Sequence, residues 1–577
     1  MYVLGINETH SATAALLKDG KIIACASEER FTKVKKQSGY PKQAVSFCLN
    51  YGVITIDDID LLVFGGSNPL LRFFYSREDL QKISSILNDF LLPIYEIFPS
   101  PFIIGEEVFR KIHKLGAKLW KQIHVIRLSR LSKVPRKKIC YFDHHLAHAA
   151  SAYYIFPPSH KPKLVITNDS SGDGSSGKVY LVKENNWIEL ASSSNRLSLA
   201  SIYYYVTKVL GFKGDEEEYK VMGLAGYTSQ HQLGKLTHIF QKLIILKDMT
   251  FKGQLPYWLC LSYLKKKLFG ERFDFVAGSL QNFVENLLCS QVAAAINKTK
   301  VTDVVLGGGL AMNIKANMKV SQINKLKSLM IGPSCGDEAN AFGYCFLGYR
   351  KRCQMLDVKF QIQPVKNLNL GPGFSEEEIK NAVLEITAIK IKRVKREELA
   401  KEVAKLLYEG KIVARFAGRM EFGHRSLGNR SILADPRDAR IVKIINDQIK
   451  RRDFWMPFAP TILKERVKDY LINPKGLESP FMMIGFETTK QGREQIPATL
   501  HPYDFTCRPQ ILSKEDNPDY WKIIKEFEDL SGVGAVLNTS FNLHGEPIVC
   551  TPQDALRVFQ KSGLEYMILE NYLIRKL

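Results

Sequence analysis

The sequence predicts an α/β protein in two parts: an N-terminal part made of a duplicated β-rich unit, and a C-terminal α/β part. Two stretches predict the duplication, because residues 2–27 read as strand, strand, Asp-Gly turn and strand, and residues 163–184 again read as strand, Gly-rich turn and strand. Helical and strand patterns restart after a basic patch, which places the boundary between the parts near residues 355–368. A chain of 577 residues is long enough for both parts.

The remaining elements follow from periodicity and from the positions of glycines. Residues 143–154 have the spacing of a helix, and residues 283–299 form an amphipathic helix. Residues 303–317 read as a buried strand, a glycine turn and a helix. In the C-terminal part, residues 397–418 predict a helix and then a strand, and residues 533–549 predict a strand, a polar loop and a strand.

The chain is strongly basic, with 81 Lys and Arg against 59 Asp and Glu and a net charge of +22. Such an excess favours anionic partners, namely nucleotides, phosphorylated substrates, nucleic acid or a lipid surface, although a Lys-rich proteome gives the same balance. The ten cysteines are scattered without a CxxC pair, the N-terminus lacks the features of a signal peptide, and no run of about 18 apolar residues occurs. We expect a cytoplasmic protein without disulfides and without a membrane span.

Residues 84–138 differ in character from the rest of the chain. Their first part is apolar and broken by prolines, and residues 110–138 hold eleven Lys and Arg and no acidic residue. Such a segment is typical of a solvated helical face. It also fits a helical lid, a contact with a membrane surface or a contact with an anionic substrate.

The glycine-rich turns predict phosphate contacts. One strand leads into GDGSSG, which contains Gly172 and Gly174, and another leads into Gly307, Gly308 and Gly309. The backbone N–H groups of such turns can bind phosphate oxygens, and two of them in the halves of a duplicated unit fit a nucleotide held in a cleft. This is the arrangement of the actin/hexokinase/Hsp70-like fold, which we predict for the N-terminal part. Neither turn is a GxxxxGK[ST] P-loop.

Three histidines lie in DHHLAHAASAYY, and two of them, His144 and His148, are four residues apart. On a helix this spacing places both imidazoles on one face, where they can bind a metal, bind a phosphate or only cover the helix. A metal needs a further ligand, ideally a carboxylate, and Asp337 and Asp169 qualify because both sit in turns after predicted strands. His145 points about 100° away and is expected to take no part.

His10 lies in the first turn of the chain, beside the cleft that this topology would make. A neutral imidazole there can take a proton from a substrate hydroxyl, and the alternative is an ordinary histidine of a surface turn. We take His10 as the candidate catalytic residue.

The C-terminal part contains a dense group of arginines. Residues 416–438 hold four of them, interleaved with glycine: Arg419, Arg425, Arg430 and Arg437. Guanidinium groups bind phosphate and carboxylate through paired hydrogen bonds, so this stretch predicts an anion site rather than a solvated face. Further cationic or neutral hydrogen-bonding groups downstream are Arg451, Arg452, Asn538, Ser540 and Asn542.

Taken together, these motifs resemble one known family. In chain order they are HSATAALL, SEERFTKVK, DHHLAHAASAYY, NDSSGDG, GGGLAMN, GRMEFGHRSLGNRSILADPR, WMPFAP and LNTSFNLHGEP. They resemble the O-carbamoyltransferase family that modifies nodulation factors, cephalosporins and aminoglycosides. Residues from about 70 to 138 fall outside the resemblance and look like a family-variable, basic insertion.

The resemblance implies two domains with separate tasks. Residues 1–355 would be the carbamoyl-transfer domain, similar to the metal-containing protein that transfers threonylcarbamoyl to tRNA. Residues 365–577 would be similar to the synthase of threonylcarbamoyl-adenylate, and would form carbamoyl-adenylate from ATP and carbamoyl phosphate. The N-terminal domain would then pass the carbamoyl group to a hydroxyl of a sugar-containing or natural-product acceptor and release AMP.

The resemblance also implies roles for individual residues. His144 and His148 would hold Fe²⁺ or another divalent metal, completed by Asp337 and Asp169, and His10 would activate the acceptor hydroxyl. The nucleotide, together with Mg²⁺, would be bound by Lys35, Asp169, Gly172, Gly174, Gly307, Gly308, Gly309 and Asn313. Carbamoyl phosphate or the adenylate phosphate would be bound by Arg419, Arg425, Arg452, Asn538 and Ser540.

Two other functions stay open. The net charge of +22 and the basic residues 110–138 suit an enzyme that transfers a carbamoyl or threonylcarbamoyl group to tRNA, although no known RNA-binding module is recognisable. The other is a catalytically inactive nucleotide-binding protein, and the retained histidines and arginines argue against it. We expect a small-molecule or glycan acceptor and no stable nucleic-acid partner, and leave open a homodimer and a membrane-surface contact through residues 84–138.

Overall fold

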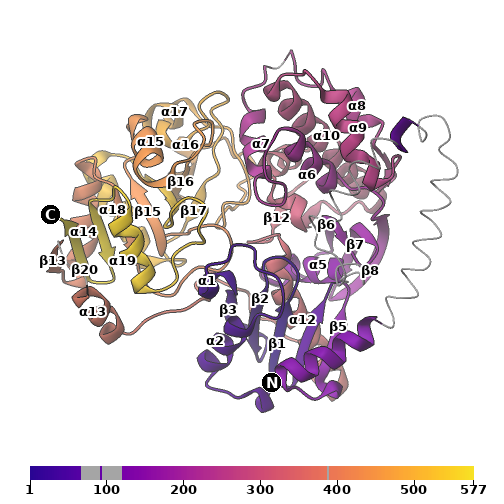
Figure 1. The fold of residues 1–577 in the computed structure, drawn as a ribbon, viewed down its shortest axis with the longest axis horizontal. Helices are drawn as coiled ribbons and strands as arrows, with labels where there is room; N and C mark the ends of the chain where they lie inside the picture. The colour runs from indigo at the N-terminus through magenta and orange to yellow at the C-terminus, as the bar shows by residue number, and fades with distance from the viewer. Residues whose placement is uncertain (67–90, 94–119, 230, 386–388) are drawn as a thin grey trace. The chain divides into compact units, whose positions relative to one another are not determined.

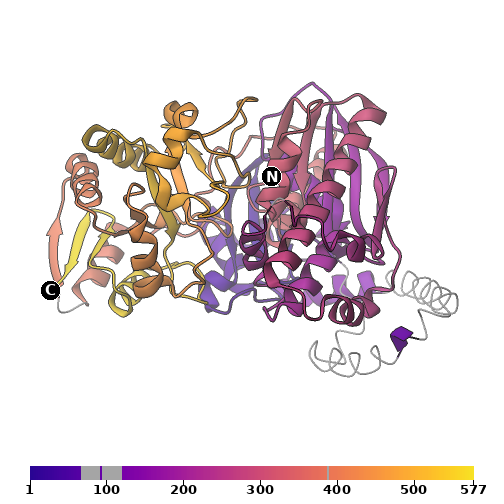
Figure 2. The same cartoon turned by 90° about the horizontal axis from the view of Figure 1, so that it is seen from above.

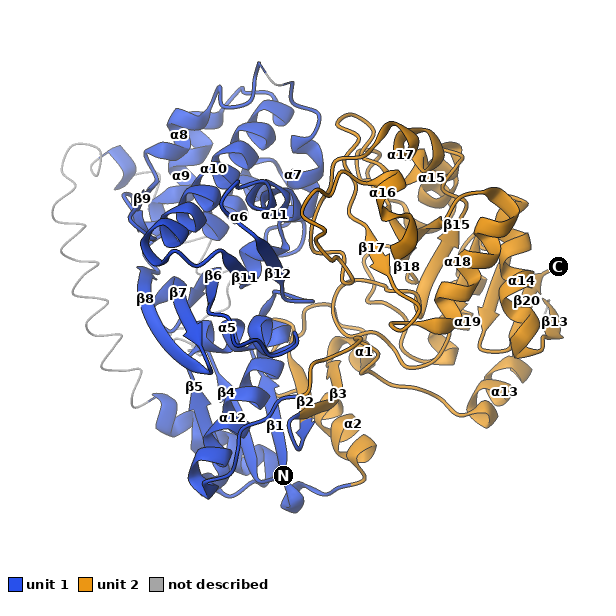
Figure 3. Ribbon diagram, turned by 180° about the vertical axis from the view of Figure 1, so that it is seen from behind, with its two compact units in different colours: residues 1–9, 17–20, 54–362 blue, residues 10–16, 21–53, 363–577 orange. Residues whose placement is uncertain are grey.

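A computed structural model describes residues 1–66, 91–93, 120–229, 231–385 and 389–577 (Figures 1 and 2). The chain forms two compact units, shown in different colours in Figure 3. Unit 1 comprises residues 1–9, 17–20 and 54–362, and unit 2 comprises residues 10–16, 21–53 and 363–577. The assignment of separate tasks to residues 1–355 and 365–577 stays a prediction.

The first sheet has the strand order β3-β2-β1-β4-β5. Strand β1 runs parallel to β4, and β4 runs parallel to β5. The predicted Asp-Gly turn joins β2 to β3, and both of its residues, Asp19 and Gly20, have positive φ. The strands are β1 (Tyr2–Asn7), β2 (Thr13–Lys18), β3 (Lys21–Ser27), β4 (Leu61–Gly65) and β5 (Ile139–Phe142).

The second sheet, in unit 1, has the order β8-β7-β6-β11-β12. Strand β6 pairs antiparallel with β7 and parallel with β11, and β11 is parallel to β12. This order repeats the first sheet strand for strand, which confirms the predicted duplication and the actin/hexokinase-like fold. The strands are β6 (Lys163–Gly172), β7 (Ser175–Lys183), β8 (Asn186–Ser194), β11 (Asp303–Gly307) and β12 (Ser328–Ile331).

Helix α12 (Asn340–Leu356) connects the parts of unit 1, because it packs against β1, β4 and α5 (His144–Tyr154) (Figure 1). Gly343 allows this approach, since a Cβ there would lie 2.0 Å from the backbone oxygen of Ala147 in α5. The other elements of unit 1 are α6 (Leu199–Val209), α7 (Glu218–Ala225), α8 (Thr237–Gln241), β9 (Ile244–Lys247), β10 (Thr250–Gly253), α9 (Tyr257–Leu268), α10 (Phe273–Thr299) and α11 (Ile314–Ser321).

Unit 2 is built on an eight-stranded mixed sheet with the order β13-β20-β19-β14-β15-β18-β16-β17. Helices α13, α15 and α19 share an apolar core with the sheet, whereas α14 and α18 pack against each other and the sheet (Figure 3). The strands are β13 (Ile389–Arg393), β14 (Val413–Phe416), β15 (Arg430–Ala434), β16 (Ala459–Leu463), β17 (Gln510–Leu512), β18 (Ala535–Ser540), β19 (Tyr566–Leu569) and β20 (Tyr572–Lys576). The helices are α1 (Glu29–Thr32), α2 (Lys42–Gly52), α13 (Glu376–Leu384), α14 (Arg396–Tyr408), α15 (Arg440–Ile445), α16 (Val467–Tyr470), α17 (Lys490–Gln495), α18 (Pro518–Ser531) and α19 (Pro552–Lys561).

Three expectations need comment. The second strand predicted within 533–549 is wrong: the chain after β18 runs through a loop, and the Val549 N–H bonds Phe541 O without forming a ladder. Most of 84–138 lies outside the described residues, but residues 120–132 form a helix. Among the described residues, no helix is long and apolar enough to cross a membrane.

Candidate functional site

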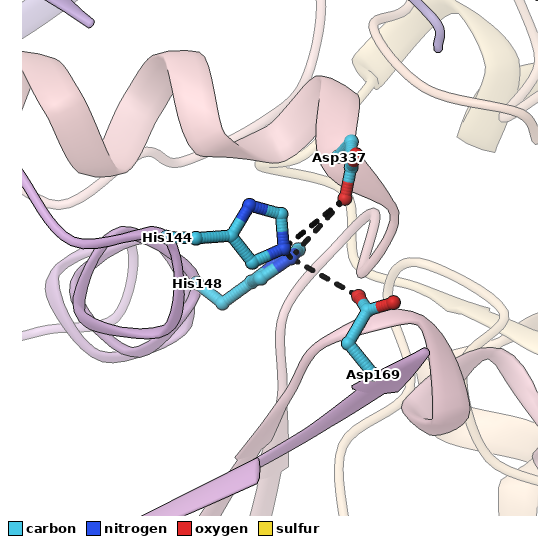
Figure 4. Close-up of side chains that lie close together, drawn as sticks. All are labelled: His144, His148, Asp169 and Asp337. Carbon is cyan, nitrogen blue, oxygen red and sulfur yellow. Dashed lines mark hydrogen bonds and ion pairs between the residues drawn. The ribbon is translucent and has the colours of Figure 1, made fainter. Parts of the chain in front are cut away.

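Four buried side chains of unit 1 converge on one point (Figure 4). His144 and His148 project from one face of α5, and Asp169 and Asp337 reach them from β6 and from the short turn after β12. His148 Nε2 lies 3.1 Å from His144 Nε2, 3.1 Å from Asp169 Oδ2 and 3.4 Å from Asp337 Oδ1. One ligand atom of each residue lies within 4.8 Å of the other three. The structure therefore brings together the four residues that the sequence singled out.

Two carboxylates fix the first turn of α5. Asp143 is the N-cap residue and accepts a hydrogen bond from the Leu146 backbone N–H at 2.9 Å. Asp173, in the turn between β6 and β7, accepts the backbone N–H of His144 at 2.9 Å and the hydroxyl of Tyr141. These bonds fix the start of α5, and they thereby fix the direction in which the His144 and His148 imidazoles point.

Each carboxylate of the cluster has a hydrogen-bond donor of its own. Asp169 accepts the Gly309 N–H at 2.8 Å through Oδ2 and the Ser170 N–H at 2.5 Å through Oδ1. Asp337 accepts the Thr9 hydroxyl at 2.5 Å through Oδ2, which leaves Oδ1 facing the histidines. Such outer partners orient metal ligands in known sites.

Burial and charge act in opposite directions on the protonation of the cluster. Burial lowers the pKa of His148, but the hydrogen bonds and charges of Asp169 and Asp337 outweigh it and raise the pKa to about 9. Burial raises the pKa of Asp169, and the hydrogen bond and charge of His148 reverse that and hold it below its usual range. The arrangement favours a positive charge between the two carboxylates.

His145 lies behind the cluster and outside it. Its Nδ1 is 3.2 Å from Thr167 Oγ1 and its Nε2 is 3.0 Å from Ser175 O. Burial, followed by the charges of His144 and His148, lowers the pKa of His145 to about 3. It is a neutral, hydrogen-bonded core histidine.

The predicted phosphate-binding glycines also have packing roles around the cluster. A Cβ on Gly172 would lie 2.2 Å from His144 Cδ2, and a Cβ on Gly308, where φ is +80°, would lie 2.4 Å from Asn168 O. Gly309 donates its N–H to Asp169, and Gly307 faces the backbone of His148. Gly174 has a φ of +85° and open space around it. Their contact with a nucleotide stays a prediction.

Asn313 uses both ends of its carboxamide within unit 1. Its Oδ1 accepts the Ala316 N–H at 3.0 Å and so caps α11, and its Nδ2 donates to Gln281 Oε1 at 2.9 Å. The carboxamide nitrogen has a second N–H beyond the one given to Gln281, and a contact of that N–H with a nucleotide stays a prediction. His10 and Lys35 are exposed residues of unit 2, and their predicted roles stay predictions.

Three arginines of unit 2, namely Arg425, Arg452 and Arg508, lie close enough to act on one another. Burial, followed by the charges of Arg425 and Arg452, lowers the pKa of Arg508 well below its usual range. Arg508 Nη1 is buried and has no hydrogen-bond partner, and no carboxylate forms an ion pair with Arg508 among the residues that the structure describes. All three side chains are partly exposed, so an anion from solvent can reach them.

Lys450 adds a fourth basic side chain next to this group. It is buried, and burial followed by the charge of Arg452 lowers its pKa well below the usual value. Its Nζ donates to Asn542 Oδ1 at 2.7 Å and to the backbone and hydroxyl oxygens of Ser540. Ser540, predicted to orient a carbamoyl group, thus holds Lys450 in place.

Asn538 is buried in β18 and holds the loop that carries Arg425. Its Nδ2 donates to Ser426 O and to Thr461 Oγ1, both at 3.1 Å, and its Oδ1 accepts the Ser426 hydroxyl at 3.1 Å. The predicted direct contact of Asn538 with a carbamoyl group would have to share these bonds.

Arg419 is placed differently from the predicted phosphate contact. It stacks 3.9 Å above the ring of Tyr51, and its donors go to the Tyr51 hydroxyl and to the backbone oxygens of Ile23, Leu370 and Gly371. It lines a groove of about 690 Å³ between α2 and the loops beside β14. The N–H groups of the Arg419 guanidinium therefore already donate to local oxygen acceptors, and we do not include Arg419 in the anion site.

Two more arginines of the 416–438 stretch are used internally. Arg430 is fully buried, stacks on Phe416 and donates to Ala417 O at 2.9 Å and Gly418 O at 3.0 Å. Arg437 forms a paired contact with Asp435. Of the four arginines in this stretch, Arg425 alone joins the cationic group.

Sequence reasoning missed several residues at both sites. Lys450 directly precedes Arg451 and Arg452, so the run KRR is a local signal that could have indicated it. Arg508 stands alone in TCRPQ and carries no local signal. Thr9 and Asn340 also carry no motif of their own, whereas Asp173 lies in the motif NDSSGDG and had no role predicted for it.

Within the basic segment 110–138, the described helix over 120–132 is anchored next to the cluster of His144, His148, Asp169 and Asp337. Glu8 is buried beside Thr9, and its carboxylate contacts His124 Nε2 at 2.6 Å and Arg127 Nη1 at 3.0 Å. His124 also stacks on Phe64 of β4, with 5.0 Å between ring centroids. The helix over 120–132 is therefore a packed part of unit 1 and not only a solvated face.

Comparison with known proteins covers both units. A family model described as "Carbamoyltransferase N-terminus" matches residues 2–346, and one described as "Carbamoyltransferase C-terminus" matches residues 404–576. The chain is 31% identical to the uncharacterized protein sll1178 of a Synechocystis species and 31% identical to the uncharacterized protein MJ1051 of Methanocaldococcus jannaschii. These alignments cover all of this chain and 97% and 99% of the relatives. It is also 28% identical to nodulation protein NolNO of Sinorhizobium fredii, over 98% of this chain and 79% of that protein.

Proposed function

The chain belongs to the carbamoyltransferase family and is a carbamoyl-transferring enzyme, and we propose that it is an O-carbamoyltransferase that works through carbamoyl-adenylate. Unit 2 would form the adenylate from ATP and carbamoyl phosphate. The carbamoyl group would then pass to a hydroxyl of a sugar-containing or natural-product acceptor. The resemblance to nodulation proteins supports an acceptor that is a small molecule or an oligosaccharide.

The observation that carries the first half is the cationic group of Arg425, Arg452, Arg508 and Lys450 in unit 2. Partly exposed guanidinium groups that repel one another are best stabilised by bound phosphate. In the proposed step, water cleaves the bond between carbamoyl and phosphate, and the resulting carbamate oxygen attacks the α-phosphorus of ATP. The bond to pyrophosphate breaks, so that phosphate and pyrophosphate leave. The arginines stabilise the charge that develops on the phosphate oxygens.

In the second half, the oxygen of the acceptor hydroxyl attacks the carbamoyl carbon and the bond to AMP breaks. A carbamate is a poor electrophile, and the mixed anhydride with AMP supplies a good leaving group. We assign the hydroxyl proton to His10, whose imidazole is exposed and can accept it. AMP departs with the electron pair of the broken bond between the carbamoyl carbon and the phosphate oxygen, and the carbamate ester remains on the acceptor.

The unit 1 cluster fits a divalent metal by the chemistry of its donors. Two imidazole nitrogens and two carboxylate oxygens are a set that suits Fe²⁺ and its neighbours among the transition metals. His144, His148, Asp169 and Asp337 would hold the ion, which when bound would act as a Lewis acid on carbonyl or phosphate oxygens. The donors that hold the carboxylates, Thr9 and Gly309 among them, are the outer partners that such a site needs.

The test is release of pyrophosphate and AMP from ATP and carbamoyl phosphate, with Fe²⁺ and Mg²⁺ present and without acceptor. We expect pyrophosphate from the wild-type protein and from the His144→Ala/His148→Ala pair, because the histidines serve transfer. Arg508→Met should lose it, since the cationic group loses a member.

Absence of pyrophosphate from folded, nucleotide-binding wild-type protein would refute the adenylate mechanism. If Arg508→Met kept pyrophosphate formation and the histidine pair lost it, the division of tasks between the units would be wrong.

A further inference from the structure

Asn340 stands at the first position of α12, and its side chain is completely buried against the histidine cluster. Its Nδ2 lies 3.4 Å from His144 Nδ1 and 3.3 Å from His148 Nε2. Its Oδ1 is buried and has no hydrogen-bond partner among the described residues. A buried carbonyl without a donor is costly, so this orientation of the carboxamide needs an explanation.

The protons of the histidines decide which end of the carboxamide can face them. Both Nε2 atoms point into the cluster, where they lie 3.1 Å apart and face Asp337 Oδ1 at 3.5 and 3.4 Å (Figure 4). A neutral imidazole carries one proton, so an Nε2 that offers its lone pair leaves the proton on Nδ1. His144 Nδ1 is then a donor and cannot accept from an amide N–H.

A half-turn of the carboxamide resolves the conflict at His144. It places Oδ1 where Nδ2 lies, within hydrogen-bond reach of the His144 Nδ1–H, and it moves the amide N–H groups to the buried position that Oδ1 leaves. Histidines that bind metals almost always donate their other N–H to an oxygen acceptor, which fixes the tautomer and the ring orientation. No other described side chain contacts His144 Nδ1 within hydrogen-bond distance.

We propose that Asn340 is a positioning residue for the metal centre, whose carbonyl accepts the His144 Nδ1–H and holds the tautomer that leaves Nε2 free to bind the ion. This inference rests on the proposed metal site, and it is independent of which acceptor is carbamoylated. It assigns one outer partner to each of three ligands: Thr9 to Asp337, Gly309 to Asp169, and Asn340 to His144.

The test uses the full-length protein and Co²⁺, whose visible absorption reports both binding and coordination. Asn340→Leu removes both polar atoms at similar size, and Asn340→Asp keeps the acceptor. We expect Asn340→Leu to weaken Co²⁺ binding about 10- to 100-fold, the range found for outer partners of metal ligands. Asn340→Asp should bind within about threefold of the wild type or more tightly, because a carboxylate is the stronger acceptor for an imidazole N–H.

Asn446→Leu is the matched control, because Asn446 is also buried with an orphaned Oδ1 but lies in unit 2. It should leave the Co²⁺ affinity and spectrum unchanged, and its thermal midpoint gives the scale for the loss of a buried amide. Wild-type affinity in folded Asn340→Leu would overturn the proposal, as would an Asn340→Asp variant that binds as weakly as Asn340→Leu.

The His144→Ala/His148→Ala pair separates this inference from the proposed function. If the pair binds Co²⁺ as the wild type does, the metal site itself is wrong and the inference falls with it. If the pair loses Co²⁺ and Asn340→Leu does not, only the inference fails.

Discussion

A substitution at Gly172 tests whether close packing holds the His144 ring in the cluster of His144, His148, Asp169 and Asp337. Its backbone has an ordinary negative φ, so alanine is allowed there, but a Cβ would lie 2.2 Å from His144 Cδ2 and 2.4 Å from Cγ. Ordinary van der Waals contact begins at 3.4 Å, so the His144 ring must retreat by about 1.2 Å. The first turn of α5 cannot follow freely, because Asp173 holds the His144 N–H.

Gly172→Ala should therefore cost both stability and metal affinity. Forcing one extra methyl group into a packed site costs about 1–3 kcal/mol. Metal–ligand distances tolerate only about 0.2 Å, so a ring displaced by about 1.2 Å no longer binds. We expect Co²⁺ affinity to fall at least about 100-fold, beyond the loss of an outer partner.

Gly174→Ala is the matched control two residues away. Its φ of +85° strains an alanine by about 1–2 kcal/mol, but no atom lies within 4 Å of its Cβ, so metal affinity should be unchanged. Co²⁺ titration and thermal unfolding of both variants decide the matter. A Gly172→Ala protein that is stable and binds Co²⁺ as the wild type does would refute the steric reasoning.

Three further predictions concern other parts of the chain. Arg508→Met should raise the thermal midpoint without anion, because the charges of Arg425 and Arg452 repel that of Arg508, and should lose the stabilisation that inorganic phosphate gives the wild type. The reverse pattern would remove the anion site. Burial lowers the pKa of His145 to about 3, so between pH 6.5 and pH 3 the unfolded chain binds a proton at His145 and the folded chain does not. The wild type therefore loses about 2 kcal/mol of unfolding free energy relative to His145→Gln when the pH falls from 8 to 5. A difference between the two proteins that does not change with pH would contradict this. His124→Ala should lower the unfolding free energy by about 1–3 kcal/mol, because the buried Glu8 carboxylate loses its buried partner and keeps the partly exposed Arg127, while pyrophosphate formation stays intact. An unchanged midpoint would show that the helix over 120–132 is not anchored through Glu8.

Local patterns predicted much of the fold, because alternation, glycine turns and helical spacing are properties of neighbouring residues. The duplicated sheets and the strand β14 after its helix follow such patterns. The strand expected near Val549 is absent: the Val549 N–H bonds Phe541 O, and no ladder forms there. Whether an apolar run becomes a strand depends on what lies beside it.

The sequence by itself determined the α/β class, the duplication, and the spacing that puts His144 and His148 on one helix face. It also supplied Asp169 and Asp337, although the turn expected at both holds for Asp337 and is wrong for Asp169, which lies within β6. These inferences succeed because they depend on distances of a few residues along the chain.

Only the tertiary structure decided how the polar groups are used. Arg419 has the sequence context of an anion ligand, yet nearby backbone carbonyls occupy it, whereas Arg508 has no motif and joins Arg425 across 83 positions of sequence. Likewise Asn340 reaches His144 from 196 residues away. A guanidinium or a carboxamide bonds whichever acceptor folding brings within about 3 Å, and that proximity is set by the packing of distant elements.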